Sequence, residues 1–264
     1  MMAFEDIIFE KEAGTARIVI NRADKMNSFR TRTIEELHAA LLEVSADNSV
    51  GVTVISGAGG RAFCSGGDIA EMLDLDRVTG REFLFKFMNC LQEVRNVPHP
   101  VIAAVDGYCL GGGNEINLAC DLTLATEKSR FGQVGPTVGS IPVLAGTQYL
   151  PRCLGDKRAK EVVFLCKRYT AREAKEMGWI NQVVEDGKLE DEVKTWCERI
   201  LEMSPQSLRI AKLSLNFEAD LMKPSFTHGI ELLSMTYGSE ELKEGMSAFL
   251  EKRKPEFMKF RRQK

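Results

Sequence analysis

Several patterns that mark other classes of protein are absent from this 264-residue sequence. No apolar run reaches the roughly 20 residues that cross a bilayer, and the N-terminus lacks the charged start and apolar core of a secretory signal. The seven cysteines include no Cys-x-x-Cys pair, and the three histidines form no ligand pattern with them. We therefore expect a cytoplasmic protein without a metal, whose cysteines are small buried apolar groups.

Nucleic acid is not expected as the main partner, because a net charge of -3 provides no concentrated positive face. Basic residues gather only at 252–254 and in the tail 259–264, which are solvated ends or could meet ligand phosphates. The two common nucleotide motifs are missing: there is no Gly-x-Gly-x-x-Gly, and no glycine loop continues into Gly-Lys-Ser/Thr. A hydrophobic content of 44% is ordinary for a globular protein.

The sequence is organised around residues 101–121, where an apolar run of strand length is followed by three glycines and then by apolar residues at 116, 118 and 119. This order predicts a strand, a tight turn and the start of a buried helix. The first N–H groups of such a helix have no partner within it, so the turn could bind an oxyanion. Close packing alone also explains a glycine triplet, and the helix dipole alone favours Glu115 in the first turn.

Residues 50–69 repeat this arrangement, with a strand, a glycine-rich turn and a second helix start. Further strands are predicted at 4–10, 16–21, 122–125 and 129–132, and helices at 33–44 and 81–97. These strand–strand–helix units predict an α/β coil with both glycine turns on one side. Beyond residue 150, an extended piece is expected at 180–184 and helices at 156–165, 171–177, 189–203, 205–216, 226–235 and 240–252.

Several motifs together resemble the crotonase superfamily, which includes enoyl-CoA hydratases and isomerases. They are 63–69 (Phe-Cys-Ser-Gly-Gly-Asp-Ile), 107–115 with Asp121, 131–133 (Phe-Gly-Gln), 146–148 (Gly-Thr-Gln) and 174–183. The resemblance covers nearly the whole chain in order. It implies an α/β fold in which a ββα spiral at 1–200 binds an acyl-CoA, and a helical region at 201–264 supports a trimer or a dimer of trimers.

The resemblance also implies which residues would form the site. The amides of Gly67 and Gly112 would bind the thioester oxygen as an oxyanion hole, and Ser65, Asp68 and Ile69 would hold the CoA. Asp68 is equally well explained as the N-cap of its helix. Enolate chemistry of this kind needs only fixed amides and a proton carrier, so no cofactor is implied beyond the acyl-CoA substrate.

Glu115 matches the first of the two glutamates with which hydratases manage water and protons. The second falls at Gly135, where the sequence instead resembles 1,4-dihydroxy-2-naphthoyl-CoA synthase and ring-opening ketocyclohexanecarboxyl-CoA hydrolases. Tyr237 lies where those enzymes place a tyrosine that reaches a neighbouring subunit, whereas Ile141 and Pro142 match ordinary hydratases. A glycine at 135 would enlarge an acyl pocket formed with Ile141 and Pro142, or it could belong to a plain turn.

We therefore expect a lyase, an enoyl-CoA hydratase acting on a bulky or cyclic unsaturated acyl-CoA. Glu115 would be the general acid or base, and Tyr237 a second proton donor. The alternative is carbon–carbon bond chemistry on an acyl-CoA, either ring closure as in the naphthoate synthase or hydrolytic ring opening. A third hypothesis is a CoA-binding protein without catalysis, because only one of the two hydratase glutamates is present.

Overall fold

The larger of two β-sheets contains the strands with the longest apolar runs. The structure, a computed structural model, describes residues 4–261. In this sheet β1 (Ile7–Glu12) and β2 (Thr15–Ile20) form an antiparallel hairpin. The strand order of this sheet is β1-β2-β3-β5-β7-β10. From β2 onward neighbouring strands are parallel, and the remaining strands are β3 (Val52–Gly57), β5 (Val101–Val105), β7 (Leu122–Thr126) and β10 (Gln182–Val184). Every residue of β5 is buried, as expected for a central parallel strand covered on both faces.

A second, smaller sheet carries the glycine turns. Its order is β4-β6-β8-β9, and it consists of β4 (Ala62–Cys64), β6 (Tyr108–Leu110), β8 (Arg130–Gly132) and β9 (Tyr169–Thr170). β4 and β6 are parallel, and their register places Cys64 opposite Cys109. Because each strand runs into its own glycine turn, this register brings the two turns together at one end of the sheet.

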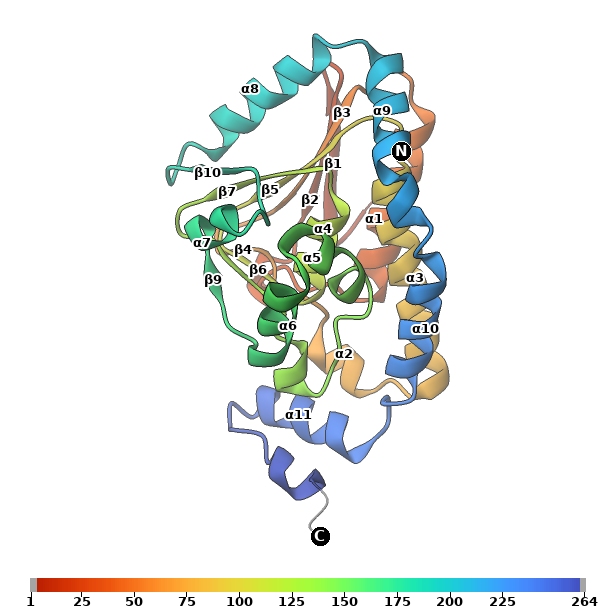
Figure 1. Cartoon of the computed structure of the whole chain (residues 1–264), viewed down its shortest axis with the longest axis vertical. Coiled ribbons are helices and arrows are strands. Elements are labelled where there is room, and N and C mark those ends of the chain that lie inside the picture. The colour runs from red at the N-terminus through yellow and green to blue at the C-terminus, as the bar shows by residue number, and fades with distance from the viewer. Residues whose placement is uncertain (1–3, 262–264) are drawn as a thin grey trace.

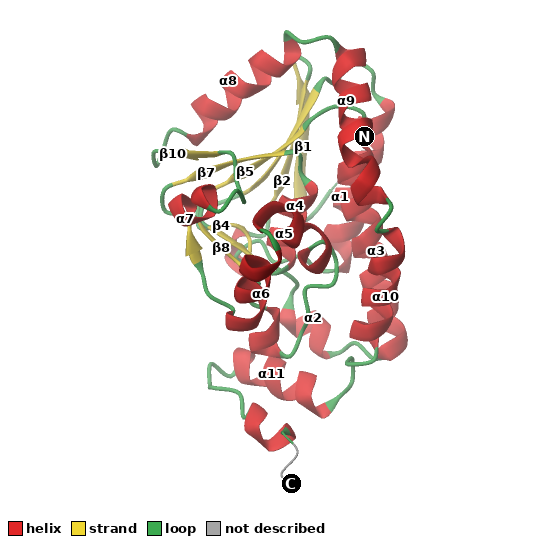
Figure 2. Cartoon of the chain, in the orientation of Figure 1, coloured by secondary structure: helices red, strands yellow, loops and turns green. Residues whose placement is uncertain are grey.

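Helices surround the sheets, and three of them, α1 (Thr31–Ala46), α3 (Arg77–Asn96) and α10 (Lys223–Ser234), run along one side of the molecule (Figures 1 and 2). α4 (Gly112–Ala119) packs between α3 and α5 (Gly146–Leu154). The remaining helices are α2 (Ile69–Leu73), α6 (Asp156–Leu165), α7 (Ala171–Glu176), α8 (Leu189–Leu201), α9 (Pro205–Asp220) and α11 (Glu240–Leu250). Short 3-10 turns are η1 (Ala23–Lys25), η2 (Gly135–Val138) and η3 (Phe257–Phe260).

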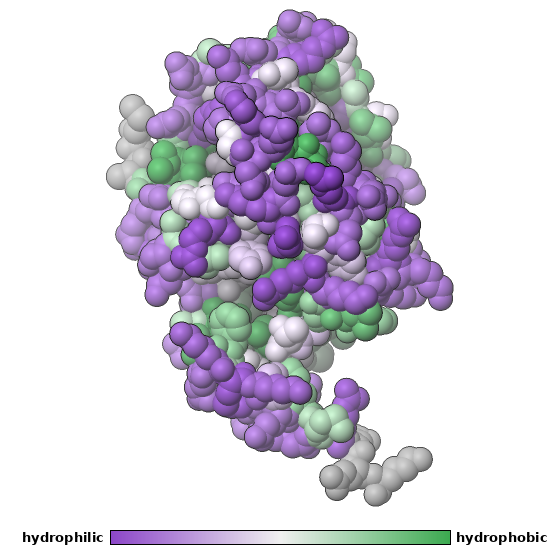
Figure 3. Space-filling model, turned by 90° about the vertical axis from the view of Figure 1, so that its left-hand side faces the viewer, coloured by the Kyte–Doolittle hydropathy of each residue, from purple (hydrophilic) through white to green (hydrophobic). Residues whose placement is uncertain are grey.

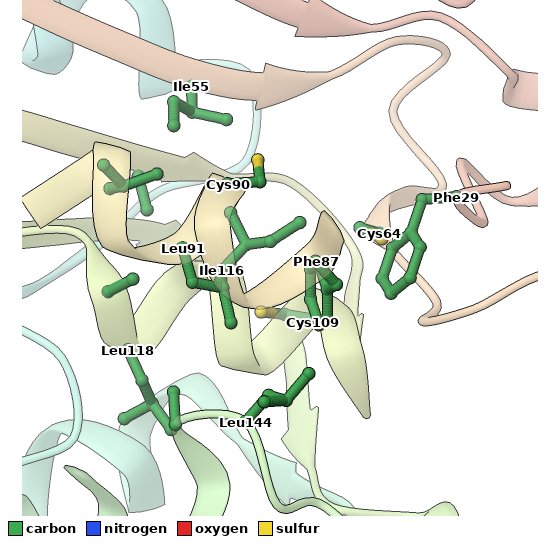
Figure 4. Packing of buried hydrophobic residues seen from close by; sticks show 14 of the residues in the cluster. Phe29, Ile55, Cys64, Phe87, Cys90, Leu91, Cys109, Ile116, Leu118 and Leu144 are labelled. Carbon is green, nitrogen blue, oxygen red and sulfur yellow. The ribbon is translucent and has the colours of Figure 1, made fainter. Parts of the chain in front are cut away.

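The larger of two hydrophobic cores joins the sheets to most of the helices, and the smaller one lies between the larger sheet and α8. Figure 4 shows part of the larger core, with Phe87 and Leu91 of α3 close to Ile116 of α4, and with Phe29 at the side of Cys64. The same core includes side chains of α10 and α11, so the C-terminal helices are anchored to the body of the chain. On the face in Figure 3, hydrophilic residues cover most of the body, and hydrophobic residues are visible at its upper edges and where the C-terminal segment meets it.

The α/β coil and the helical second half that the sequence predicts are confirmed, with both glycine turns on one side. Within the described part of the chain, no helix is long and apolar enough to cross a membrane. The expectation that the cysteines are buried is wrong for Cys153, which lies exposed on α5, and Cys120 and Cys166 are only half-buried. The division at 1–200 and 201–264 stays a prediction, and the last three residues of the basic tail 259–264 lie outside the described residues.

Candidate active site

Two glycine turns from different parts of the sequence meet at the edge of the smaller sheet. A Cβ at Gly66 would lie 3.3 Å from the amide nitrogen of Gly112, so the two backbones are in contact. Gly112 is the first residue of α4 and has no intrahelical partner for its N–H group. Neither this N–H nor that of Gly67 donates a hydrogen bond within residues 4–261. Two free donors on neighbouring turns are what an oxyanion site requires.

The ring of Phe29 holds these turns in place. A Cβ at Gly112 would lie 2.5 Å from the ring, and one at Gly67 would lie 3.7 Å from it. Phe29 also pairs with the Gly67 turn through its backbone, because its N–H donates to the carbonyl of Gly66 and its carbonyl accepts from Asp68. A side chain at Gly112 would displace the ring, so close contact with Phe29 requires glycine at this position.

Glu115 is the buried acid of the site. It lies in the first turn of α4 and is 6% exposed. Its Oε1 accepts hydrogen bonds from the N–H groups of Leu144 (2.9 Å) and Gly146 (3.2 Å). Burial raises the pKa of Glu115 to about 8, although the N–H groups of Gly146 and Leu144 lower it. A carboxyl group with such a pKa can both give and take a proton near neutral pH.

A strained backbone segment supplies the two N–H donors to Glu115. Ala145, between them, has a φ of 79°, which an L-residue adopts only at an energetic cost. Its own N–H donates to Oε1 of Gln148 at 3.1 Å, which fixes the turn. Strain of this kind is concentrated at functional sites.

A cavity of about 70 Å³ connects Glu115 with both glycine turns. The predicted pocket residues Gly135, Ile141 and Pro142 all line it. Glu115 is its single ionisable side chain among the described residues, and apolar and aromatic groups form most of the wall. The remaining lining residues are Phe29, Gly67, Met72, Phe83, Leu84, Phe87, Gly111, Gly112, Gln133, Ser140, Val143, Leu144 and Leu233.

The three predicted CoA residues lie beside the cavity rather than in its wall. Asp68 caps α2, since its Oδ1 accepts from the N–H of Ala70 at 3.2 Å, and its Oδ2 pairs with Arg22 at 3.0 Å. Both carboxylate oxygens are therefore engaged within the chain. Ser65 and Ile69 are half-buried on either side of this turn.

Tyr237 is not brought to the cavity of its own chain. It is 4% exposed, and its ring lies against Gly80 of α3, where a Cβ would be 2.5 Å away. Its hydroxyl group has no hydrogen-bond partner among residues 4–261, and burial raises the pKa of this phenol. Within one chain, therefore, Glu115 lines the cavity, whereas Tyr237 packs against α3 outside the cavity wall.

The sequence interpretation missed two parts of the site. One is the pair of backbone amides at Leu144 and Gly146, which no side-chain pattern marks. The other is Gln133, which follows β8, is fully buried and lines the cavity. The motif at 131–133 that contains Gln133 contributes to the family resemblance. However, the sequence pattern does not predict that the side-chain amide of a glutamine after a short strand lies in the cavity. No group of three or more His, Cys, Asp or Glu side chains within 4–261 could hold a metal ion.

The chain matches known proteins along nearly its whole length. Residues 10–260 match the family model of enoyl-CoA hydratase/isomerase. An enoyl-CoA hydratase from Mycobacterium avium subsp. paratuberculosis K-10 has a similar structure, with a TM-score of 0.89 and 27% identity over 97% of this chain and 99% of that one. An enoyl-CoA hydratase from Bacillus anthracis is 32% identical, with a TM-score of 0.78 and coverage of 95% and 98%. An enoyl-CoA hydratase/isomerase from Xanthobacter autotrophicus Py2 is 30% identical, with a TM-score of 0.87 and coverage of 94% of this chain and 94% of that one.

Proposed function

The chain belongs to the enoyl-CoA hydratase/isomerase family, within the crotonase superfamily, and on that premise we propose that it is a lyase that adds water to an unsaturated acyl-CoA. The observation that carries the proposal is the position of Glu115. It is the one ionisable side chain described in the cavity wall, and it shares that wall with Gly67 and Gly112. An acid–base group thus lies beside two free N–H donors, the arrangement that forming and protonating an enolate requires.

The proposed steps use these groups alone. The amides of Gly67 and Gly112 bind the thioester oxygen. Ionised Glu115 takes a proton from water as the hydroxide oxygen bonds to the β-carbon, and the electrons of the double bond move to the thioester oxygen. Glu115 then gives that proton to the α-carbon, and the thioester carbonyl is restored. One carboxyl group moves the proton both ways, and no metal or redox cofactor takes part.

The acyl group that we propose is bulky or cyclic. Gly135 contributes no side chain to the wall, and the rings of Phe29, Phe83 and Phe87 provide apolar surface. The cavity volume of about 70 Å³ is smaller than the roughly 300 Å³ or more of pockets that enclose larger ligands. A ring would require the walls to move apart, so substrates of both sizes must be compared.

Carbon–carbon bond chemistry is the second candidate, and the glycine at 135 favours it. The naphthoate synthase and ring-opening relatives that the sequence resembles share this glycine. Their chemistry would need a second acid–base group, for which Tyr237 is the candidate. In a single chain the buried hydroxyl group of Tyr237 lies away from the cavity, so this alternative would require Tyr237 to act in the site of a neighbouring subunit.

We also propose that the chain assembles as a trimer or a dimer of trimers. Large apolar side chains are exposed on α9, where Leu213 is 63%, Leu215 81% and Phe217 65% accessible. An apolar surface of this kind typically marks a contact with another protein. Light scattering after size exclusion should give a trimer multiple for the wild type and smaller species for Leu213→Lys/Phe217→Lys. A monomeric wild type would contradict the proposal.

Mass spectrometry of the protein incubated with four acyl-CoA thioesters tests the proposed reaction. Crotonyl-CoA and cyclohex-1-ene-1-carbonyl-CoA should each be able to gain one water without ring opening, and the preferred one defines the acyl class. Glu115→Gln should abolish the gain. Water gain with ring opening of 2-oxocyclohexane-carbonyl-CoA, or water loss from succinylbenzoyl-CoA, would instead establish carbon–carbon chemistry. Binding of CoA without any mass change would leave a CoA-binding protein.

A further inference from the structure

The side chain of Gln133 presents two polar atoms for which the chain provides no partner. It is 0% exposed, and neither Oε1 nor Nε2 has a hydrogen-bond partner among residues 4–261. Leaving a buried amide unpaired is unfavourable, and native structures rarely do so unless water or a ligand completes the site. Because Gln133 lines the cavity, such a partner can reach it from there.

Gln133 lies close to the acid of the site. A Cβ at Gly146 would be 3.2 Å from Nε2 of Gln133 and 3.3 Å from Oε1 of Glu115, so both head groups lie over the same glycine. Two backbone N–H groups already donate to that Oε1, which leaves the second carboxylate oxygen for a molecule in the cavity. Gly135, two residues further on, adds no polar side chain of its own.

This geometry suits one small polar molecule between the two side chains. A buried water needs two to four polar partners and at least roughly 10–15 Å³ of space. The amide of Gln133 and the free oxygen of Glu115 supply three polar atoms, and the cavity of about 70 Å³ supplies the space. The apolar remainder of the wall would not hold water in a defined orientation.

We propose that the Gln133 carboxamide is a catalytic residue that holds the reacting water against Glu115, in the place where a second carboxylate is missing. Its Oε1 accepts one hydrogen of the water, whose other hydrogen passes to Glu115 while the oxygen bonds to the β-carbon. The amide neither gains nor loses a proton, so Glu115 moves the proton and Gln133 only orients the water. This inference rests on the proposed hydration.

Two reactions of the same enzyme separate this function from a structural one. Hydration of crotonyl-CoA needs the held water, whereas exchange of the α-protons of butyryl-CoA in D₂O needs only Glu115 and the amides that bind the thioester oxygen. Gln133→Met removes both polar atoms at nearly constant volume. We expect it to lower kcat for hydration about 100-fold, with exchange and KM within about threefold of the wild type. Gln182→Met, a partly buried glutamine on β10, is the matched control and should change neither reaction.

Each outcome decides the matter. An equal loss of hydration and exchange in Gln133→Met would mean that Gln133 only shapes the pocket, and unchanged hydration would mean that it binds at most a structural water. If Gln133→Met does not fold, the test compares Gln133→Glu, which keeps an acceptor oxygen, with Gln133→Leu, which does not. At equal rates of α-proton exchange, Gln133→Glu should retain more hydration than Gln133→Leu. A wild type that hydrates neither crotonyl-CoA nor cyclohex-1-ene-1-carbonyl-CoA would overturn the proposed function and this inference with it.

Discussion

Replacing Glu115 with glutamine should make the substrate-free protein more stable at alkaline pH. Glutamine can keep the two hydrogen bonds from Leu144 and Gly146 through its Oε1, so the substitution removes the charge while the packing stays the same. In the folded chain the pKa of Glu115 is raised from 4.5 to about 8 by burial. Because one pKa unit corresponds to about 1.4 kcal/mol, ionising Glu115 in the folded state costs roughly 5 kcal/mol more than in the unfolded chain.

The sign of the effect follows from the direction of this shift. A carboxyl group with a raised pKa in the folded state stabilises the fold fully at pH values below 4.5, and this contribution is lost as pH rises through about 8. The Glu115→Gln variant has no ionisable group at this position, so it lacks this pH-dependent contribution. We therefore expect variant and wild type to be similarly stable near pH 4.5 and to differ by roughly 5 kcal/mol above pH 8.

Urea unfolding at half-unit steps from pH 5 to pH 9 measures this difference. Protein concentration must be constant, because assembly would shift the apparent stability. Glu82→Gln, on the exposed face of α3, controls for the loss of a surface carboxylate and should give a nearly flat difference. A flat difference for Glu115→Gln as well, within about 1 kcal/mol, would refute the claim that a buried carboxyl group titrates at this site.

Four further predictions follow from the site and its support. In hydration assays, kcat/KM should rise with pH up to about 8 and then level, since ionised Glu115 is the base; a maximum near pH 5 would contradict this. Gly112→Ala should lower kcat/KM at least about 100-fold, because its Cβ would press on a ring 2.5 Å away and move one amide donor. Tyr237→Phe should leave hydration within about threefold in the same assay, since the hydroxyl group is unpartnered; a 100-fold loss would indicate a function in a neighbouring subunit's site. Asp121→Asn should cost roughly 3–5 kcal/mol in urea unfolding by leaving the buried ammonium of Lys212, 2.7 Å away, without its carboxylate partner, and a cost below about 1 kcal/mol would show that the pair contributes little.

Hydrophobic periodicity was sufficient to predict most of the fold. It located the strands of the larger sheet and the long helices to within a few residues. It missed β4, β6 and β9, because strands of two or three residues are too short to show alternation. It also missed α5, because Pro151 within this helix argues against a helix in the sequence.

The site was predictable only where it depends on local sequence. Glycine runs and a glutamate in the first turn of a helix can be recognised directly, and the resemblance to the crotonase superfamily then singles out Gly67, Gly112 and Glu115 among them. The amides that hold Glu115 belong to a backbone turn 29 and 31 residues further along the chain, and their donation depends on tertiary structure. Gln133 is similar, because its unpaired amide exists only once the surrounding chain has folded.

The position of Glu115 also explains how one carboxyl group could manage both proton transfers. It lies in the first turn of α4, close to the Gly112 amide that would bind the thioester oxygen. An enolate oxygen and an ionised Glu115 would then place two negative charges at one helix N-terminus, in a buried cavity where like charges raise each other's pKa. The charges need not coexist, because Glu115 becomes neutral by taking the proton of water as the enolate forms. The enolate in turn holds that proton on Glu115 until the α-carbon accepts it. A second carboxylate at position 135 would add a further negative charge to this cavity, whereas the neutral amide of Gln133 would orient water beside the single glutamate without adding one.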